Sequence, residues 1–260
     1  MDEQKINKSR SLYYAMFSRF FIFSADNTKY FELSNLINIL KENPLDDATG
    51  VALTNLSKVI KSDSNVEFIS EFDDIFHSPE STTVPATASY YDEHIESGKK
   101  RVEMQNFLAK TKIRRDEKTC TDYEDHVGFI FAVLSELAQE ISDGKVEYKN
   151  TAHCIFEQIL NNFVDEFARG LYEHENTVIF KDIVVVLNSF ITLERLYLEV
   201  SKPAYVKKQR VVESASCDTD ISDAEKERRA RNKLLRAQGP KKEENESCPI
   251  NMAYDVEDDI

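Results

Sequence analysis

The chain has 260 residues, 41% of them hydrophobic, which is enough apolar material to bury a substantial core and predicts a folded protein. Its formal net charge of −14 at pH 7 argues against a nucleic-acid surface, because such a surface needs a cationic footprint. Only six glycines and six prolines are present, too few for the many tight turns of a β-sandwich, so helices are favoured.

Apolar residues recur at helical spacing almost throughout the first 200 residues, and strand-like alternation is nearly absent. Residues 12–23 are apolar or aromatic on nearly every side, which predicts a central helix covered by several neighbours. Further helical patterns run through residues 33–40, 53–60 and 69–76. Together they predict an N-terminal helical half, about residues 1–78.

Residues 79–89 form a loop by composition, because Pro79 and Pro85 enclose a run of serine and threonine. Helical patterns resume in a C-terminal half, about residues 90–201. The segment IVVVLNSFITL, residues 183–193, is ambiguous because consecutive valines favour a strand, but its length favours a helix. From residue 202 to 260 the chain is polar and charged, which predicts a disordered tail.

The N-terminal residues, the most apolar run and the cysteines together indicate a cytoplasmic protein. The first residues, MDEQKINKSRSLYY, lack the order of a secretory signal. The most apolar run, Val178 to Val200, is interrupted by Lys181, Asp182, Glu194 and Arg195 and so predicts a buried helix rather than a membrane span. Four cysteines form no C-x-x-C pair, which suits free thiols in a reducing cytosol: Cys120, Cys154, Cys217 and Cys248.

The segment TDYEDHVGF, residues 121–129, has two interpretations. Glu124 and Asp125 beside His126 are the residue types of a general acid/base site, since histidine titrates near neutral pH. Thr121 and Glu124 also have the spacing of a capping box, which would start the apolar helix that comes next. The local pattern favours the cap.

The sequence contains little that could support catalysis or metal binding. None of the five histidines has a glutamate three residues earlier, so a di-metal helical bundle is not expected. Asp74 and His77 are the nearest approach, and His77 is better explained as a histidine at a helix C-terminus. No glycine-rich phosphate loop is present. We expect no enzymatic activity, no metal and no stably bound cofactor.

Three segments resemble the TorD/DmsD family of cytoplasmic chaperones for molybdoenzymes exported by the twin-arginine pathway. They are RSLYYAMFSRFF, EFDDIFHSPESTTVPATASYY and YEDHVGFIFAVLSELAQE, in the family's order, and the resemblance covers about residues 10–200. The matching positions are Phe72, Ile75 and Phe76, then Pro85, Ser89 and Tyr91, then Glu124, Asp125, His126 and Gly128. Asp122 and Tyr123 stand where the family often has Glu-Pro, and the chain lacks the tryptophan that commonly lines the family's groove.

The resemblance implies a single all-α domain of two helical halves, with a hinge at Asp122, Tyr123 and Gly128. It also implies that a twin-arginine signal peptide binds at Phe72, Ile75, Phe76, Pro85, Ser89, Tyr91, Glu124, Asp125 and His126. Phe72, Phe76, Pro85 and Tyr91 would form an apolar floor. Glu124 and Asp125 would meet the arginines. His126 would hold a carboxylate or respond to pH.

The partner implied by the family is the precursor of a molybdoenzyme, which the chaperone holds until a molybdenum pterin cofactor is inserted, delaying its export. The chaperone itself would bind no nucleic acid, would not insert into a membrane, and would be a monomer or a domain-swapped dimer. The alternative is an all-helical acidic adaptor that binds another folded protein.

Overall fold

The computed structural model describes residues 3–23, 27–61, 65–116 and 121–204, together with the single positions Arg228 and Arg231. The chain divides into two units, Met1–Arg210 and Val211–Ile260, and the helical domain is the first of them. Apart from residues 202–204 and the two arginines, the predicted tail lies outside the described residues. So do Cys120, Cys217 and Cys248, whereas Cys154 is a free thiol.

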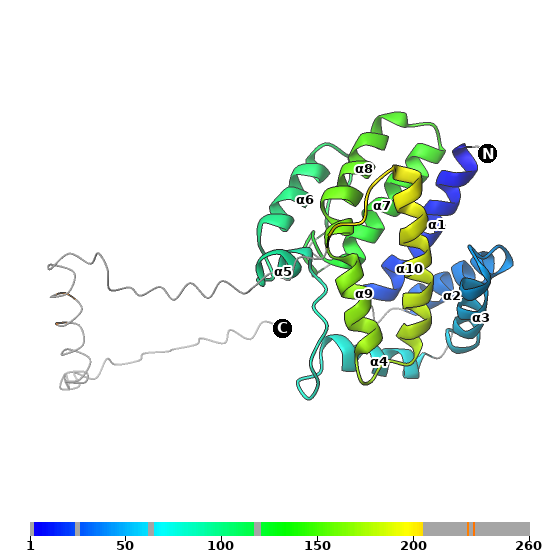
Figure 1. The fold of residues 1–260 in the computed structure, drawn as a ribbon, viewed down its shortest axis with the longest axis horizontal. Helices are drawn as coiled ribbons and strands as arrows, with labels where there is room; N and C mark the ends of the chain where they lie inside the picture. Colours follow the sequence, from blue (N-terminus) through cyan, green and yellow to red (C-terminus); the bar gives the residue numbers. More distant parts are fainter. Residues whose placement is uncertain are drawn as a thin grey trace, which may run out of the picture. The chain divides into compact units, whose positions relative to one another are not determined.

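The described residues form α-helices, two short 3₁₀ turns and no β-strand, so the predicted all-α fold is confirmed (Figure 1). The α-helices are α1 (Glu3–Phe21), α2 (Asn27–Glu42), α3 (Asp47–Val59), α4 (Val66–Phe76), α5 (Ala88–Glu93), α6 (Lys99–Ala109), α7 (Val127–Ser142), α8 (Lys149–Gln158), α9 (Val164–Glu173) and α10 (Ile179–Leu198). The ambiguous segment 183–193 lies inside α10. No helix within the described ranges is long and apolar enough to cross a membrane.

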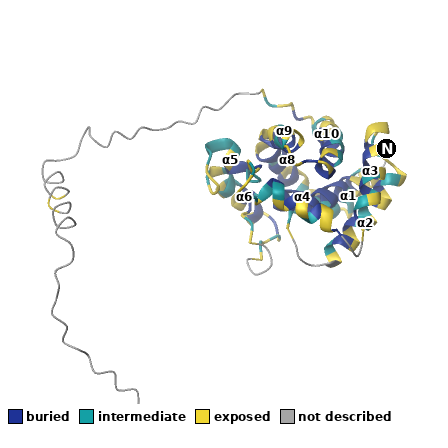
Figure 2. Cartoon of the chain, turned by 90° about the horizontal axis from the view of Figure 1, so that it is seen from below, coloured by how far each residue is buried: buried dark blue, intermediate teal, exposed yellow. Residues whose placement is uncertain are grey.

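Helix α1 lies at the centre of the domain, as its all-round apolar pattern predicted (Figures 1 and 2). It packs along α7, and its buried rings Phe17 and Phe21 lie 5.3 and 5.9 Å from the ring of Phe131 on that helix. Phe17 also lies 5.5 Å from Phe190 of α10, which in turn packs on α3. The two predicted halves of the chain therefore share one core.

A buried polar cluster joins α1 to α10. The guanidinium of Arg10 donates to both carboxylate oxygens of Glu194 at 2.7 Å, and the hydroxyl of Tyr14 donates to the same carboxylate at 2.6 Å. Burial, together with the adjacent Glu194, holds the pKa of Tyr14 well above its ordinary value, so the hydroxyl keeps its proton and remains a donor. Since a buried carboxylate needs such partners, the cluster specifies how the two helices align.

Helix α10 has no cap from its own sequence. Its first N–H groups, at Val178, Ile179 and Phe180, donate instead to the carboxylate of Glu71 on α4, at 2.8 to 2.9 Å. The positive end of the helix dipole favours an anion at this position. Glu71 thus fixes α4 against the start of α10, where the ring of Phe180 lies 5.5 Å from that of Phe68.

Replacing Glu71 with alanine leaves three N–H groups, two of them buried, without their acceptor, and we expect a loss of about 3 kcal/mol in the free energy of unfolding. Urea denaturation of the variant and the wild type measures this loss. Glu67→Ala is the matched control, because Glu67 is an exposed acid on the same helix, and it should cost less than about 1 kcal/mol. Equal losses for the two variants would contradict the capping role.

Candidate functional site

A groove of about 700 Å³ lies between the C-terminal ends of α1 and α4 on one side and the segment before α7 on the other. The lining residues are Phe21, Phe23, Phe72, Phe76, His77, Ser81, Thr82, Thr83, Val84, Pro85, Ala86, Thr87, Tyr90, Glu96, Thr121, Asp122, Tyr123 and His126. This set combines aromatic rings, hydroxyl groups and two carboxylates, and contains neither lysine nor arginine.

The aromatic wall comes from α4 and from the residues after α1. Phe72 and Phe76 are one helical turn apart with ring centroids 4.7 Å from each other, and Phe23 lies 5.8 Å from Phe72. The ring of Phe23 remains 49% exposed although it touches this cluster. An apolar ring held in place but left open to solvent is a typical contact point for a ligand.

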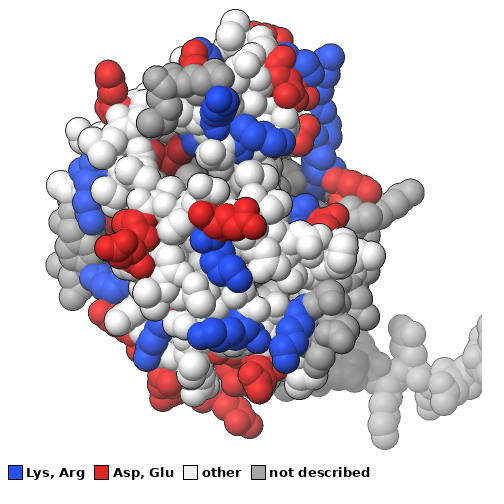
Figure 3. Space-filling view, turned by 90° about the vertical axis from the view of Figure 1, so that its right-hand side faces the viewer, with Lys and Arg blue, Asp and Glu red and all other residues white. Residues whose placement is uncertain are grey.

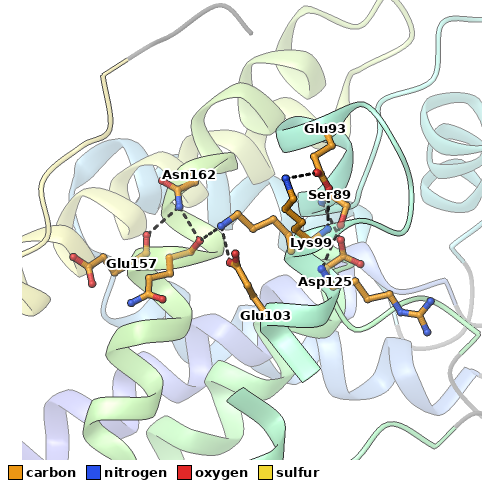
Figure 4. A network of polar contacts seen from close by, with 10 residues as sticks. Ser89, Glu93, Lys99, Glu103, Asp125, Glu157 and Asn162 are labelled. Carbon is orange, nitrogen blue, oxygen red and sulfur yellow. Dashed lines mark hydrogen bonds and ion pairs between the residues drawn. The ribbon is translucent and has the colours of Figure 1, made fainter. Parts of the chain in front are cut away.

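The opposite wall depends on a short antiparallel pairing between residues 86–88 and 125–127. The N–H of Val127 donates to the carbonyl of Ala86 at 2.7 Å, and that of Ala88 donates to the carbonyl of Asp125 at 2.9 Å. The side chain of Asp125 is completely buried and accepts from the N–H of Ser89 at 2.9 Å, within the first turn of α5 (Figure 4). Asp125 therefore holds α5 beside the start of α7.

Glu124 is bound by the chain's own arginines. Arg101 donates to one carboxylate oxygen at 2.7 Å and Arg115 to the other at 3.1 Å. Burial by itself would raise the pKa of Glu124, but the hydrogen bond from Arg101, together with others, lowers it to about 2. Glu124 is thus a charged, internally paired group that does not line the groove.

The capping-box interpretation of Thr121 and Glu124 is wrong, because α7 begins at Val127 and its cap is His126. The Nδ1 atom of His126 accepts from the N–H of Gly128 at 3.2 Å. Glu124 cannot reach back as a capping residue since both its oxygens are held by arginines. The sequence pattern correctly predicted that a helix starts here, but it placed the start too early.

His126 is a neutral group in this setting. Burial lowers the pKa of its imidazole, while Asp122, with its Oδ2 atom 3.8 Å from Nδ1, and the neighbouring Asp125 raise it by smaller amounts. A neutral ring is also what the cap requires, because Nδ1 accepts a hydrogen bond only when it carries no proton.

Gly128 allows α7 to approach the end of α1. A Cβ atom at this position would lie 2.6 Å from Cγ1 of Ile22 and 3.0 Å from the backbone carbon of Phe21. The glycine that resembled a hinge residue is therefore needed for close packing in this structure. Asp122 and Tyr123, the other two predicted hinge residues, lie in the segment that lines the groove.

The structure brings some of the predicted site residues together and separates others. Phe72, Phe76, Pro85 and His126 line the groove, and Ile75, Ser89, Tyr91, Glu124 and Asp125 do not. Ile75 is fully buried, and Tyr91 stacks on Phe163 at 5.3 Å while its hydroxyl donates to the carbonyl of Pro85 at 2.9 Å. The residues that do not line the groove pack behind the residues that do.

Several lining residues were not predicted from the sequence as part of a site, among them Phe23, His77, Tyr90 and Glu96. Phe23 follows α1 and ends the aromatic run of residues 12–23, and this position could have suggested an aromatic contact point. Nothing in the sequence, however, indicates that its ring stays exposed. His77 is the C-cap of α4, as predicted, and its Nδ1 atom lies 3.2 Å from a carboxylate oxygen of Asp73. No group of three or more metal-ligating side chains occurs among the residues that the structure describes.

The described residues form an all-helical protein with a groove that is lined by aromatic rings and two carboxylates. Residues 42–169 match the family described as nitrate reductase delta subunit. This segment includes α4, the proline loop and α7, and the match confirms the resemblance of the chain to the TorD/DmsD family of redox-enzyme maturation chaperones. The family consists of chaperones rather than enzymes. No curated protein matches the chain significantly.

The lowered pKa of His126 predicts a pH dependence of stability. In the unfolded chain the imidazole of His126 binds a proton near pH 6.5, which is above its pKa in the folded state. The stability that comes from burying the neutral imidazole is therefore complete above pH 6.5 and is lost as the pH falls through the folded pKa. His126→Asn keeps a capping acceptor but does not titrate. The free energy of unfolding of the wild type should therefore fall relative to His126→Asn between pH 7.5 and 5, as measured by urea denaturation. Parallel curves would contradict this.

Gly128→Ala tests the close approach of α7 to α1. Alanine normally stabilises a helix by up to about 1 kcal/mol relative to glycine. Here the added methyl group overlaps Ile22, and we expect a net loss of about 2 kcal/mol in thermal or urea unfolding. Gly170→Ala in helix α9 is the control, since its Cβ would make only an ordinary contact, 3.5 Å from Cγ1 of Val84, and it should not destabilise the fold. A stabilised Gly128→Ala variant would show that the helices separate easily.

Proposed function

We propose that this protein is a cytoplasmic chaperone that binds the twin-arginine signal peptide and the apo form of an exported molybdoenzyme. It aids cofactor insertion and delays export. The observation that carries the proposal is the groove of about 700 Å³, with Phe23, Phe72 and Phe76 on one side and carboxylates on the other. The match to a family of maturation chaperones supports the same class of function.

A signal peptide of this kind carries paired arginines before an apolar stretch. The apolar stretch would lie on the aromatic wall, where burial of an exposed phenylalanine ring stabilises the complex by about 25 cal/mol per Å² of apolar area. The net charge of −14 would speed the encounter with a basic peptide. The molybdenum pterin belongs to the client in this proposal, and the chaperone holds no cofactor stably.

Glu124 and Asp125 have a different part in this proposal from the one that the family resemblance implied. Their carboxylates are engaged with Arg101, Arg115 and the N–H of Ser89. They would act on the peptide indirectly, by holding the wall formed by residues 86–88 and 121–126 at a fixed distance from α4.

The alternative, an acidic adaptor for a folded protein, has one observation in its favour. Leu193 and Leu196 of α10 are 43% and 72% exposed and lie outside the groove. The face in Figure 3, however, carries acidic and basic side chains interspersed and no continuous acidic patch. Co-purification separates the two functions. A molybdoenzyme precursor retained only with its signal peptide supports the chaperone, and retention after deletion of the signal favours the adaptor.

Phe23→Ser tests the groove directly, because this ring is half exposed and its loss should disturb the fold little. With a synthetic peptide that carries two arginines before an apolar stretch, we expect calorimetry to give about tenfold weaker binding, the effect of about 1.4 kcal/mol. Phe31→Ser is the matched control, since Phe31 is 58% exposed on α2 and does not line the groove. Equal affinities for the two variants would place the peptide elsewhere.

A further inference from the structure

A second cleft, of about 400 Å³, lies between the turn after α6, residues 111–114, and α7, and it shares no lining residue with the groove. On α7 it is lined by residues such as Ala132, whereas the neighbouring Phe131 packs against α1. The half-buried apolar side chains of its lining are Ile113, Ala132 and Tyr148. This outer cleft is therefore a separate surface of the helical domain.

The outer cleft carries more positive than negative charge, in a chain whose formal net charge is −14. Its charged lining residues are Lys112, Arg114 and Lys145 on the basic side and Glu136 and Glu140 on the acidic side. Lys145 and Glu140 pair with each other, which leaves Lys112 and Arg114 against the single acid Glu136. The local charge is thus opposite to that of the whole chain and favours an anionic group on a partner.

Arg114 is held in place by the chain and keeps unused donors. Its Nη1 atom donates to the carbonyls of Leu108, Thr111 and Ile113 at 2.7 to 2.8 Å, so it satisfies carbonyl groups at the end of α6. Its Nε and Nη2 atoms have no hydrogen-bond partner among the residues that the structure describes. A carboxylate can accept two parallel N–H bonds from this edge of a guanidinium, which is already oriented by the bonds of Nη1.

The rest of the lining argues against a polyanion such as a nucleic acid or an anionic membrane. Glu136 is exposed in the outer cleft, where it would repel a row of phosphate groups. The half-buried surfaces of Ile113, Ala132 and Tyr148 call for apolar contacts, which phosphate groups do not offer. A polypeptide segment can present a carboxylate beside apolar side chains and so fits both features.

We propose that the outer cleft is a docking surface for a segment of a partner protein that carries a carboxylate beside apolar side chains. The carboxylate pairs with Nε and Nη2 of Arg114, and Lys112 adds positive charge to the same lining. The apolar side chains lie on Ile113, Ala132 and Tyr148. This inference does not depend on the proposed function, because the groove has other lining residues and its only charged ones are acidic.

The test uses three synthetic peptides of equal length that share one apolar stretch and carry glutamates, glutamines or lysines beside it. In NMR titrations of the isotope-labelled, full-length wild type, the glutamate peptide should bind about fivefold more tightly than the glutamine peptide, and the lysine peptide should bind most weakly. The resonances that shift should be those of Ile113, Arg114 and Ala132, and not those of Phe72 and Phe76 in the groove.

Arg114→Gln should remove the preference for glutamate and leave the affinity for the glutamine peptide unchanged. Because this variant also loses bonds at the end of α6, Lys112→Gln is the second variant, and it should reduce the preference while those bonds remain. Lys58→Gln is the matched control, since it removes the same charge from an exposed position on α3, and it should keep the full preference. Circular dichroism checks that each variant folds, and Lys112→Gln decides if Arg114→Gln does not.

Equal binding of the three peptides by the wild type would overturn the inference, as would an unchanged preference in Lys112→Gln and in a folded Arg114→Gln. Shifts confined to the groove, or an equal loss of preference in Lys58→Gln, would do the same. A short oligothymidine or anionic lipid vesicles that displace the glutamate peptide would assign the outer cleft to a polyanion and would also overturn it. The proposed function is tested separately, by Phe23→Ser in the groove.

Discussion

The groove depends on one buried carboxylate. Asp125 is inaccessible to solvent, and burial of a charge is costly unless hydrogen bonds compensate for it. One of its oxygens accepts from the N–H of Ser89, and its backbone carbonyl accepts from the N–H of Ala88. Its other oxygen has no hydrogen-bond partner among the described residues. These two hydrogen bonds join the start of α5 to the start of α7, and that junction is one wall of the groove.

The same use of a distant acid recurs at α10. Glu71 on α4 accepts three N–H bonds from the start of that helix, much as Asp125 accepts from α5. Neither helix has a capping side chain at its own N-cap position. At the start of α5 and at the start of α10, a carboxylate from another part of the chain thus takes the place of a local capping side chain. Glu71, Glu124 and Asp125 are engaged in such contacts with the chain, and none of the three lines the groove.

Helix positions could be predicted well from the sequence, because apolar spacing at 3.6 residues depends only on which face must be buried. The central position of α1 was evident from its aromatic residues on all sides, and α10 was recognised as a buried helix. The site was less predictable. Phe72 and Phe76 line the groove, whereas Glu124, which was expected to meet a ligand, is held by two arginines. Its partners, Arg101 and Arg115, are 23 and 9 residues away in sequence, and nothing local indicates that they return to it.

The sequence by itself determined the helical class, the order of the elements and the family, since these depend on periodicity and on short motifs that can be recognised without knowledge of contacts. Only the tertiary structure decided which acids are held by arginines and which face the groove, that His126 caps α7, and that Gly128 serves a close approach of two helices. The physical reason is that pairing, burial and close packing depend on distances between residues far apart in the chain, and a pattern of neighbouring residues carries no information about those distances.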